Sequence, residues 1–297
     1  EMIHNPEQKV NEILSRMHDS IERLKNQAKR YKIKSQIIHK KSLSEGQKGL
    51  WLLQELEPNM SAYNVPIAFK IHDKIQMEFL KQAFEFMLKK HPILQTVITT
   101  DGDGSPLQYI NKERALSFSQ KSIHSLSEEE LSELLKTTFK QPFKLDGGPL
   151  MRAHLFSLSS DEHILLVTIH HIIFDGTSIL ILINDLLSAY KTYSQGQRPV
   201  LKTGKTPSYF DFVDWEQELL VSEKGEKHLA YWKEQLAGEL PLLELPIDKT
   251  RPARQTYTGA TCSVRLSTEL TGQLRHLAKE QGVSLFVLLL GVYKALL

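Results

Sequence analysis

Cysteine is nearly absent from this sequence of 297 residues, which also has no marked charge excess and no long apolar run. The single cysteine, Cys262, excludes an internal disulfide framework and is typical of the reducing cytoplasm, where we expect this chain to act. The formal net charge is only +2, so nucleic acid is not an expected partner. Apolar runs such as 285–290 fall well short of the about 20 residues of a membrane span, so no membrane partner is expected either.

Several common functional signatures are missing as well. The sequence contains no CxxC, HExxH, GxSxG or P-loop motif. These absences remove the commonest metal, serine-hydrolase and nucleotide sites, and we expect no bound metal. No secretory signal precedes the first polar stretch. The chain starts at Glu1 without an initiator methionine and stops at Leu297 inside an apolar helical pattern, so we expect it to be a piece of a longer polypeptide.

The residues that are present indicate a globular protein of mixed α and β structure. Hydrophobic residues make up 41% and charged residues 24%, and the length suits one large or two ordinary domains. Alternating or continuous apolar patterns predict strands, and apolar residues three or four positions apart predict helices. Strands are expected at 65–71, 150–158, 163–173 and 261–266, with a hairpin turn at 159–161. Helices are expected at 77–88, 177–193, 208–220 and 226–236. A further helix should begin after Ser127, its N-cap, and two more should follow residue 266.

The N-terminal residues 7–31 have apolar side chains at helical spacing with charged residues between them. A basic connector with few apolar residues follows as far as Lys41. The narrow apolar stripe leaves two interpretations open, a solvated linker helix or a helix that docks on another polypeptide.

An unusual stretch, Thr-Ile-His-His-Ile-Ile-Phe-Asp-Gly-Thr-Ser, occupies residues 168–178 inside an apolar region, where a strand is expected to give way to a helix. Successive side chains of a strand point to opposite faces, so His170 and His171 are not expected to share a metal or a proton. A histidine in an apolar strand is commonly a hydrogen-bonded core residue, and this interpretation stays open. Asp175 is costly to bury without a partner, and Gly176 indicates a positive φ or a close approach to the backbone. Strand ends of this kind are favoured places for functional sites.

The chemistry of this stretch favours proton transfer or positioning by histidine. The unperturbed histidine pKa is about 6.5, so the ring is mostly neutral at pH 7 and can accept a proton. No serine, cysteine or lysine nucleophile stands out nearby, and Thr177 and Ser178 fit the first turn of the following helix better. These residues predict transfer between two bound substrates rather than a covalent enzyme intermediate.

The segment His170-His171-Ile-Ile-Phe-Asp175-Gly176 resembles the HHxxxDG signature of condensation domains of non-ribosomal peptide synthetases. Further segments resemble other elements of that family in the family's order, and the likeness covers about residues 38–297. They are Ser44-Glu-Gly-Gln47-Lys-Gly-Leu50-Trp51-Leu52 (SxAQxRLWxL), Lys90-His91-Pro-Ile-Leu94-Gln95-Thr96 (RHExLRT), Tyr209-Phe-Asp211-Phe212-Val-Asp-Trp215 (YxDFAxW), Tyr231-Trp232-Lys-Glu-Gln-Leu and Leu245-Pro-Ile-Asp248-Lys-Thr-Arg251-Pro252.

This resemblance implies an α+β fold of two chloramphenicol-acetyltransferase-like lobes arranged in a V. Residues 1–37 would be a helical linker or docking segment, 38–205 a complete N-terminal lobe, and 206–297 inter-lobe helices with the start of a truncated C-terminal lobe. The implied reaction is amide formation between a donor acyl thioester and the amine of an acceptor thioester. Donor and acceptor carrier proteins would present both substrates on phosphopantetheine arms, beside neighbouring synthetase domains of a peptide or hybrid polyketide–peptide assembly line. The domain itself is expected to bind no cofactor, and with most of the second lobe missing the chain alone is expected to be inactive or nearly so.

The resemblance also implies roles for individual residues. His171 would face the tunnel between the lobes, His170 would support it, and the Gly176 backbone would lie close to the reacting carbonyl. Asp175 would brace the loop by a salt bridge rather than act on substrate. Whether His171 is a base or a positioning group stays open, and no substrate-binding residues are assigned.

The sequence departs from the family pattern at two arginine positions. Gln95 replaces the arginine that pairs with the motif aspartate, so we expect Arg152, on the neighbouring strand, to take over that role. Gly49 replaces the arginine of the opening element.

Two other functions stay open. A stand-alone acyltransferase of the same superfamily would use HxxxDG with coenzyme A thioesters, but the second histidine and the 245–252 passage argue against it. A degenerate condensation-like module would recruit carrier proteins or tailoring enzymes, and the loss of arginine at Gln95 favours this alternative. Within the family, the intact histidine pair argues against the heterocyclising branch.

Overall fold

The computed structural model describes residues 40–123, 126–201, 207–240, 244–245, 247–250, 252–253, 255–257 and 259–297. The predicted helix at 7–31 lies outside the described residues. The chain divides into two compact units, Glu1–His228 and Leu229–Leu297. In the described part of the chain, no helix combines the length and the apolar character that crossing a membrane requires.

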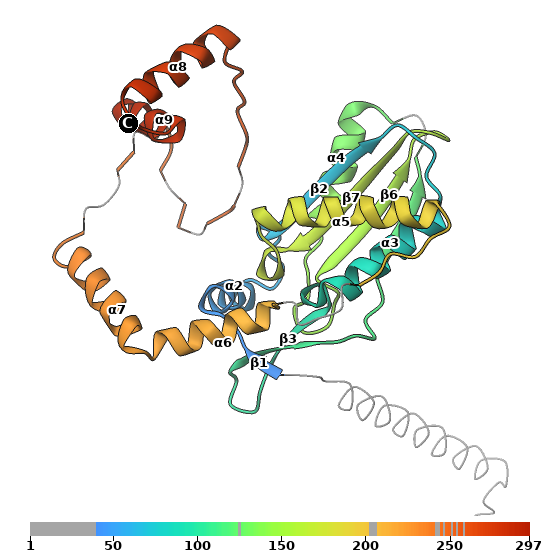
Figure 1. The fold of residues 1–297 in the computed structure, drawn as a ribbon, viewed down its shortest axis with the longest axis horizontal. Helices are drawn as coiled ribbons and strands as arrows, with labels where there is room; N and C mark the ends of the chain where they lie inside the picture. Colours follow the sequence, from blue (N-terminus) through green and yellow to red (C-terminus); the bar gives the residue numbers. More distant parts are fainter. Residues whose placement is uncertain are drawn as a thin grey trace, which may run out of the picture. The chain divides into compact units, whose positions relative to one another are not determined.

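A four-stranded sheet with the order β2-β7-β6-β5 forms the centre of the first unit (Figure 1). Its strands are β2 (Asn64–Ile71), β5 (Ser117–Ser122), β6 (Met151–Ser157) and β7 (His163–His170). β7 is antiparallel to β2 and β6, and β5 is parallel to β6. The predicted hairpin is confirmed, because β6 and β7 pair from Ser157↔His163 to Met151↔Ile169. β7 ends three residues earlier than predicted, and the 3-10 turn η2 (His171–Ile173) follows it.

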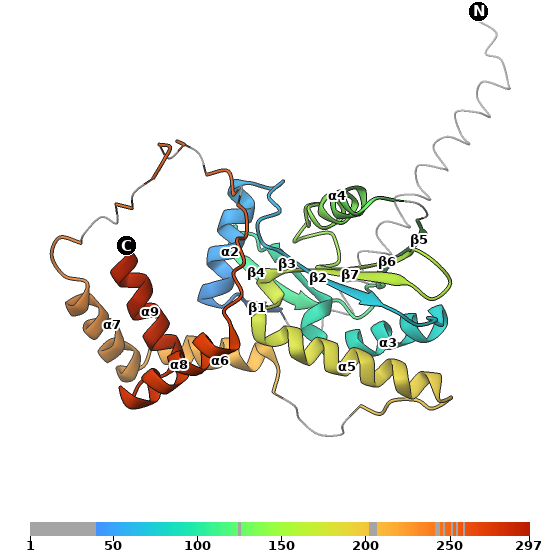
Figure 2. The ribbon, with the colours of Figure 1, turned by 90° about the horizontal axis from the view of Figure 1, so that it is seen from above.

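Helices cover both faces of this sheet (Figure 2). α3 (Met77–Lys90) and α5 (Gly176–Ser194) lie on one face, and α4 (Glu128–Phe139) lies on the other. Ser127 caps α4 as predicted, since its side chain accepts a hydrogen bond from the backbone of Glu130. The expected strands and helices of this part of the chain are therefore confirmed in their order, and β5 is a further strand that was not predicted.

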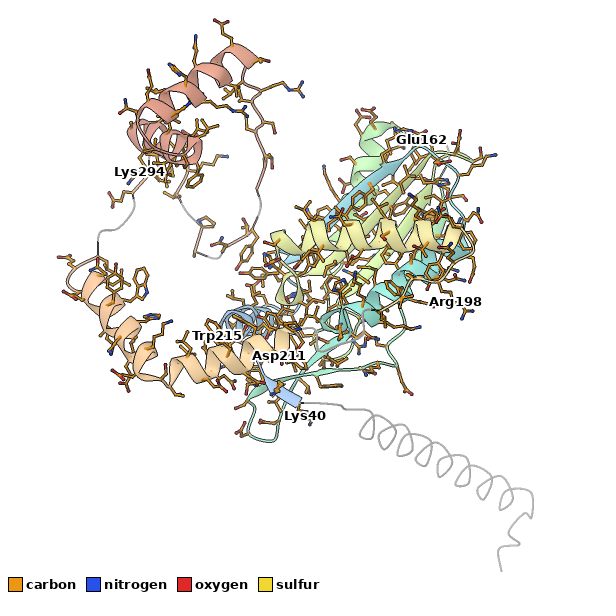
Figure 3. All side chains as sticks on the ribbon, viewed as in Figure 1. Lys40, Glu162, Arg198, Asp211, Trp215 and Lys294 are labelled. Carbon is orange, nitrogen blue, oxygen red and sulfur yellow. The ribbon has the colours of Figure 1, made fainter. Side chains whose placement is uncertain are left out.

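A smaller sheet with the order β1-β4-β3 lies at one end of the first unit. It contains β1 (Lys40–Ser42), β3 (Thr96–Thr100) and β4 (Pro106–Ile110); α2 (Glu45–Leu56) follows β1, and η1 (Pro92–Gln95) precedes β3. α6 (Tyr209–Leu220) packs beside β1, as Figure 3 shows, and Lys41 Nζ lies 2.6 Å from an Asp214 carboxylate oxygen. α6 therefore lies in the first unit, although the prediction grouped it with 206–297.

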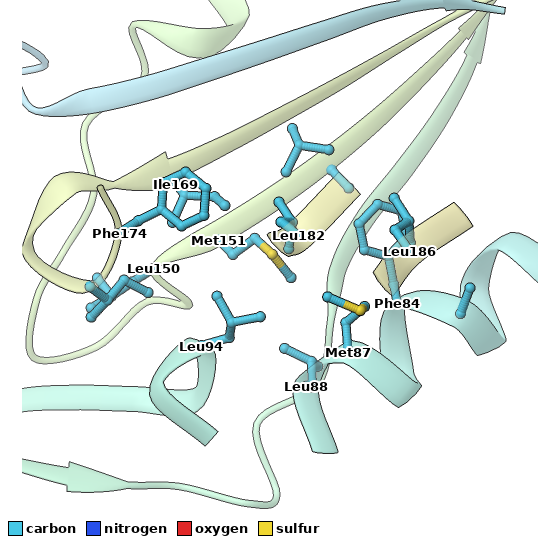
Figure 4. Close-up of a cluster of buried hydrophobic side chains, with 14 of the residues drawn as sticks. Phe84, Met87, Leu88, Leu94, Leu150, Met151, Ile169, Phe174, Leu182 and Leu186 are labelled. Atoms are coloured by element: carbon cyan, nitrogen blue, oxygen red, sulfur yellow. The ribbon is translucent and has the colours of Figure 1, made fainter. Parts of the chain in front are cut away.

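The core of the first unit follows from the alternation of side chains along β7. All eight residues of this strand are buried, and successive residues face opposite layers. Leu165, Val167 and Ile169 join a cluster with α3 and α5, drawn in Figure 4 around Phe84, Met87 and Leu182, whereas Ile164 and Leu166 pack with α4. A strand buried on both faces reads as a continuous apolar run, which is the pattern of 163–169.

The second unit contains helices and no strand among its described residues. α7 (Glu223–Gln235) crosses the point of division, and α8 (Thr268–Glu280) and α9 (Leu285–Leu296) are the two helices predicted after residue 266. The strand predicted at 261–266 is wrong. A strand needs a neighbour for its ladder of hydrogen bonds, and the described residues of this unit supply none.

Candidate functional site

The histidine motif lies where the central strand of the first unit ends. His170 is the last residue of β7, His171 opens the turn η2, and Asp175 is the N-cap of α5. The backbone of the motif is held by the sheet, because His170 N donates to Leu150 O (2.9 Å) and His171 N donates to Tyr63 O (2.8 Å). Neighbouring strands on both sides thus set the path of the chain into the turn.

His170 is a buried part of the core, with 1% of its surface exposed. Its Nδ1 accepts a hydrogen bond from Ile172 N (3.1 Å), so that nitrogen carries no proton. The proton therefore belongs on Nε2, which faces Gln54 Oε1 at 3.3 Å. The Phe143 ring meets the imidazole edge-on, with 5.9 Å between the ring centroids. Burial, and next the charge of His171, lower the pKa of His170 to about 4, so His170 is neutral at pH 7.

His171 has the opposite environment, since its side chain is exposed. Its backbone is fixed at both ends, because His171 N bonds to Tyr63 and its carbonyl accepts from Phe174 N (3.3 Å). The described residues form no hydrogen bond to its ring. The two rings therefore have different environments, but strand alternation is not the cause, because His171 lies in the turn η2 and not in β7. An anchored backbone with a free imidazole suits a residue that acts on something outside this unit.

Asp175 caps α5 and pairs with no arginine among the described residues. Its Oδ1 accepts from Ser178 N (2.8 Å) and from Ser178 Oγ (2.7 Å), and these bonds lower the pKa of its carboxyl group. Arg152 instead donates to the Gln141 carbonyl and lies over the Phe143 ring, 3.9 Å from its centroid. The expected Arg152–Asp175 salt bridge is therefore wrong.

The strand register explains why these two residues do not meet. Arg152 is paired with Thr168 across β6 and β7, and directly paired residues point to the same face of a sheet. That face is the one that α4 covers, because Leu166, two residues from Thr168, packs with α4. Asp175 is the N-cap of α5, which lies on the other face.

Gly176 is the first residue of α5. It has no positive φ, and a Cβ at this position would have no neighbour within 4 Å. Neither backbone conformation nor packing of the described residues therefore requires glycine here. Of the two reasons that the sequence suggested, the close approach of another group to the backbone remains.

Gln95 is buried, and its Nε2 donates to the Lys112 carbonyl at 3.3 Å. Its backbone carbonyl also accepts from Asn111 N at 3.0 Å. The residue that replaces the family arginine thus serves the link between η1 and β4. No bond to Asp175 is formed, which agrees with the capping role of that aspartate.

Two buried glutamines of α2 hold the motif, and neither was predicted to have a role. Gln47 Nε2 donates to the Ile172 carbonyl (3.1 Å) and exchanges hydrogen bonds with Gln108 of β4. Gln54 contacts His170, as described above. The spacing of seven residues places both on one face of α2. A pair of polar residues at this spacing in an amphipathic helix is the sequence feature that could have predicted their role.

Two cavities lie near the motif. One of about 450 Å³ is lined by Gln54 and Phe143, the two side chains that contact His170. A smaller one, of about 100 Å³, lies at the start of α5 against Phe174 and Ser178. No group of three or more potential metal ligands occurs among the described residues.

This arrangement can accept or orient a proton without a covalent intermediate. A neutral, buried His170 fixes the turn, an exposed His171 ring faces outward, and the N-terminus of a 19-residue helix begins five residues later. The first backbone N–H groups of a helix have no partner within the helix and favour negative charge. A base beside such donors suits attack of an amine on a carbonyl group.

The chain is similar to known proteins over most of its length. The condensation-domain family profile matches residues 37–297. Polyketide synthase PksN of Bacillus subtilis (strain 168) is 43% identical over 258 residues, which are 87% of this chain and 5% of PksN. A linear gramicidin synthase of Brevibacillus parabrevis is 34% identical over 260 residues, 86% of this chain and 3% of that protein. The chain therefore spans only a small part of these relatives.

Solved structures share the fold. A four-domain non-ribosomal peptide synthetase, holo-AB3403 bound to AMP and glycine, has a TM-score of 0.72 and 24% identity, covering 84% of this chain and 19% of that one. The X-domain in its complex with OxyB from teicoplanin biosynthesis has a TM-score of 0.71 and 25% identity, covering 82% and 53%. The first condensation domain of the calcium-dependent antibiotic synthetase, with a substrate analogue, has a TM-score of 0.66, 20% identity and coverages of 83% and 57%. The expected α+β fold is confirmed.

Proposed function

Because the chain belongs to the condensation-domain family, we propose that it joins a donor acyl or peptidyl thioester to the amine of an acceptor aminoacyl thioester. Carrier proteins hold both substrates on phosphopantetheine arms, so these arms are part of the substrates and not a cofactor of this chain. The observation that supports the proposal is the exposed His171 ring, set between the buried His170 and the N-terminus of α5. The single exposed cysteine, Cys262, agrees with a cytoplasmic location.

The reaction is balanced in atoms and electrons without an oxidant. The acceptor nitrogen forms a bond to the donor carbonyl carbon, the carbon–sulfur bond breaks, and the proton lost by the amine matches the one gained by the leaving thiol. An α-amine has a pKa of about 7.7–8.0, so part of it is already neutral at pH 7, and His171 receives or orients the remaining proton. Holding the two groups together supplies up to about 7–11 kcal/mol of the barrier.

The start of α5 supplies the second element of the mechanism. The Asp175 carboxylate accepts a hydrogen bond from the backbone N–H of Ser178, the third residue of the helix. The Gly176 N–H at the helix end is left for the substrate. The reacting carbonyl oxygen becomes negative as the amine adds, and helix N–H groups stabilise such charge. The missing side chain of Gly176 allows the carbonyl to come close to this backbone.

The relatives suggest the kind of assembly line. The identity to a polyketide synthase, 43%, exceeds the 34% to a gramicidin synthase. We therefore place the chain in a hybrid polyketide–peptide system, in which the donor or the product is a polyketide chain. Comparing polyketide-type and peptidyl donors in the assay below tests this placement.

The deciding experiment uses donor and acceptor carriers loaded with defined substrates and the full-length polypeptide. Mass spectrometry of the acceptor carrier then measures the condensed acyl thioester. We expect product with the natural protein and a large loss with His171→Ala, while coenzyme A thioesters fail to replace the donor carrier. Equal product from His171→Ala would contradict the proposed role of this histidine.

A second function is favoured by one comparison. The X-domain neighbour was solved in complex with OxyB, so a domain of this fold binds another protein of its biosynthesis. If this chain is a recruitment platform, His171→Ala leaves both partner binding and pathway output unchanged. The same variant therefore separates the two functions.

A further inference from the structure

The segment that follows α4 is tied to the large sheet from two strands. Asn64 Nδ2, on β2, donates to the carbonyl oxygens of Phe139 (2.6 Å) and Gln141 (2.9 Å). Arg152, on β6, donates to the Gln141 carbonyl as well. Because β2 and β6 flank β7, these bonds fix one segment across the strand that ends in the histidine motif.

This segment carries Phe143 into contact with His170. Phe143 is buried, with 3% of its surface exposed, and its ring is perpendicular to the imidazole. The Arg152 guanidinium lies over the same Phe143 ring, 3.9 Å from the centroid. Arg152 thus holds the segment through a hydrogen bond to the Gln141 carbonyl, and it holds the Phe143 ring through a cation–π contact. The half-buried guanidinium has a pKa lowered by burial, and no described carboxylate pairs with it.

The register places these residues in one row. Asn64 is paired with His170 across β2 and β7, and Arg152 is paired with Thr168 across β6 and β7. Directly paired residues share a face, and residues two apart along a strand do so too. Asn64, His170 and Arg152 therefore point to the same face of the sheet, and the contacts follow from strand pairing.

His170 also sets the position of the turn η2. Its Nδ1 receives the N–H of Ile172, the second residue of η2, and the first residue of that turn is His171. This bond exists only in one ring orientation, which Gln54 holds on one side and Phe143 contacts edge-on. A ring that turned would release the Ile172 N–H and loosen the turn.

We propose that Arg152 and Asn64 are positioning residues that hold Phe143 against His170 and so fix the turn that presents His171. The effect on catalysis rests on the proposed function, whereas the contact itself can be measured without substrate. A merely structural role would lower stability and leave the state of the His170 ring unchanged. The state of that ring is therefore the decisive measurement.

Nuclear magnetic resonance of the purified chain, labelled with 15N at histidine, reports the proton position of each imidazole. His170→Gln and His171→Gln assign the two signals. In the natural chain we expect His170 with its proton on Nε2, and no second proton until about pH 4. The neighbour whose charge acts on His170 is His171, and the same face of the sheet also carries Arg152, over the Phe143 ring, and His154, whose pKa burial and Arg152 lower.

Arg152→Met and Phe143→Leu are expected to admit water to the imidazole. The single tautomer should give way to an averaged signal, and the pKa should move from about 4 toward the ordinary value of about 6.5. Lys70→Met is the matched control, since Lys70 lies on the same face of β2 at its other end, where its Nζ is 2.6 Å from Glu162. This control removes an equal charge and should leave the His170 signal unchanged.

In the full-length polypeptide, the same two substitutions should lower kcat about tenfold or more at an unchanged KM. Unchanged His170 signals in folded Arg152→Met and Phe143→Leu would overturn the proposal. If Arg152→Met fails to fold, as judged by circular dichroism, Phe143→Leu decides, because it keeps a buried apolar side chain. If the two variants show altered His170 signals but the natural protein has no condensation activity, this inference is upheld and the proposed function is refuted.

Discussion

The Gly176→Ala substitution at the start of α5 should raise stability and lower activity. Gly176 begins this helix without a positive φ, and nothing lies within 4 Å of the place where a Cβ would stand. The methyl group is therefore accommodated, and the reduced freedom of the unfolded chain should stabilise the protein by about 0.4–1 kcal/mol. For a unit of this size, such a gain raises Tm by about 1–4 °C.

Activity should change in the opposite direction. In the proposed reaction the donor carbonyl approaches the Gly176 backbone, and the methyl group of Gly176→Ala would occupy that space. Displacing a reacting group by about 1 Å costs about 100-fold in rate, so we expect a loss of that order in kcat/KM.

The assay compares thermal unfolding and product formation in one preparation. Gly49→Ala is the matched control, because Gly49 is also exposed and helical, with nothing within 4 Å of an added Cβ. It should gain stability without losing activity. Full activity in a folded Gly176→Ala would refute the close approach of the carbonyl, and a lower Tm would refute the helix-start geometry.

Three further outcomes follow from the motif. His171→Ala should change the free energy of unfolding by less than about 0.5 kcal/mol in urea titrations, because the exposed ring has no hydrogen bond among the described residues, while product formation falls by about 10²–10⁴-fold. Stability should decline between pH 7 and pH 5 by about 2 kcal/mol more than in His170→Gln, because the unfolded His170 takes up a proton below about 6.5 that the folded one, with a pKa of about 4, does not; a parallel decline in both proteins would contradict the burial argument. Asp175→Asn should keep stability and Asp175→Ala should lose about 1 kcal/mol, since asparagine also caps a helix; equal losses from both would show that the negative charge, rather than the cap to Ser178, matters.

The local chemistry of the motif could be predicted from the sequence. An apolar run broken by two histidines, an aspartate and a glycine places a strand end, a turn and a helix start in that order, and the structure has β7, η2 and α5 there. Different environments for the two histidines were also expected, although it was the family resemblance that implied an outward-facing His171 and a supporting His170. These features depend on residues close in the chain, whose periodicity and capping are visible locally.

The partners of the motif could not be predicted in the same way. Gln54, Phe143 and Asn64 act on or near His170 from segments 27 to 116 residues away. Arg152 was expected beside Asp175, yet the strand register places it on the face of the sheet that α4 covers, and α5 lies on the other face. That choice of face depends on the register of β6 on β7 and on which layer each helix covers.

The sequence by itself therefore determined the family, the order of the elements around the motif, and the motif with its two histidines. Only the tertiary structure decided that Asp175 is a helix cap, that Gly176 faces open space, and that Arg152 reaches the site through Phe143. The physical reason is that hydrophobic period and capping are local properties of a chain. Hydrogen-bond partners of buried groups are set instead by strand pairing and layer packing, which bring together residues that no local pattern connects.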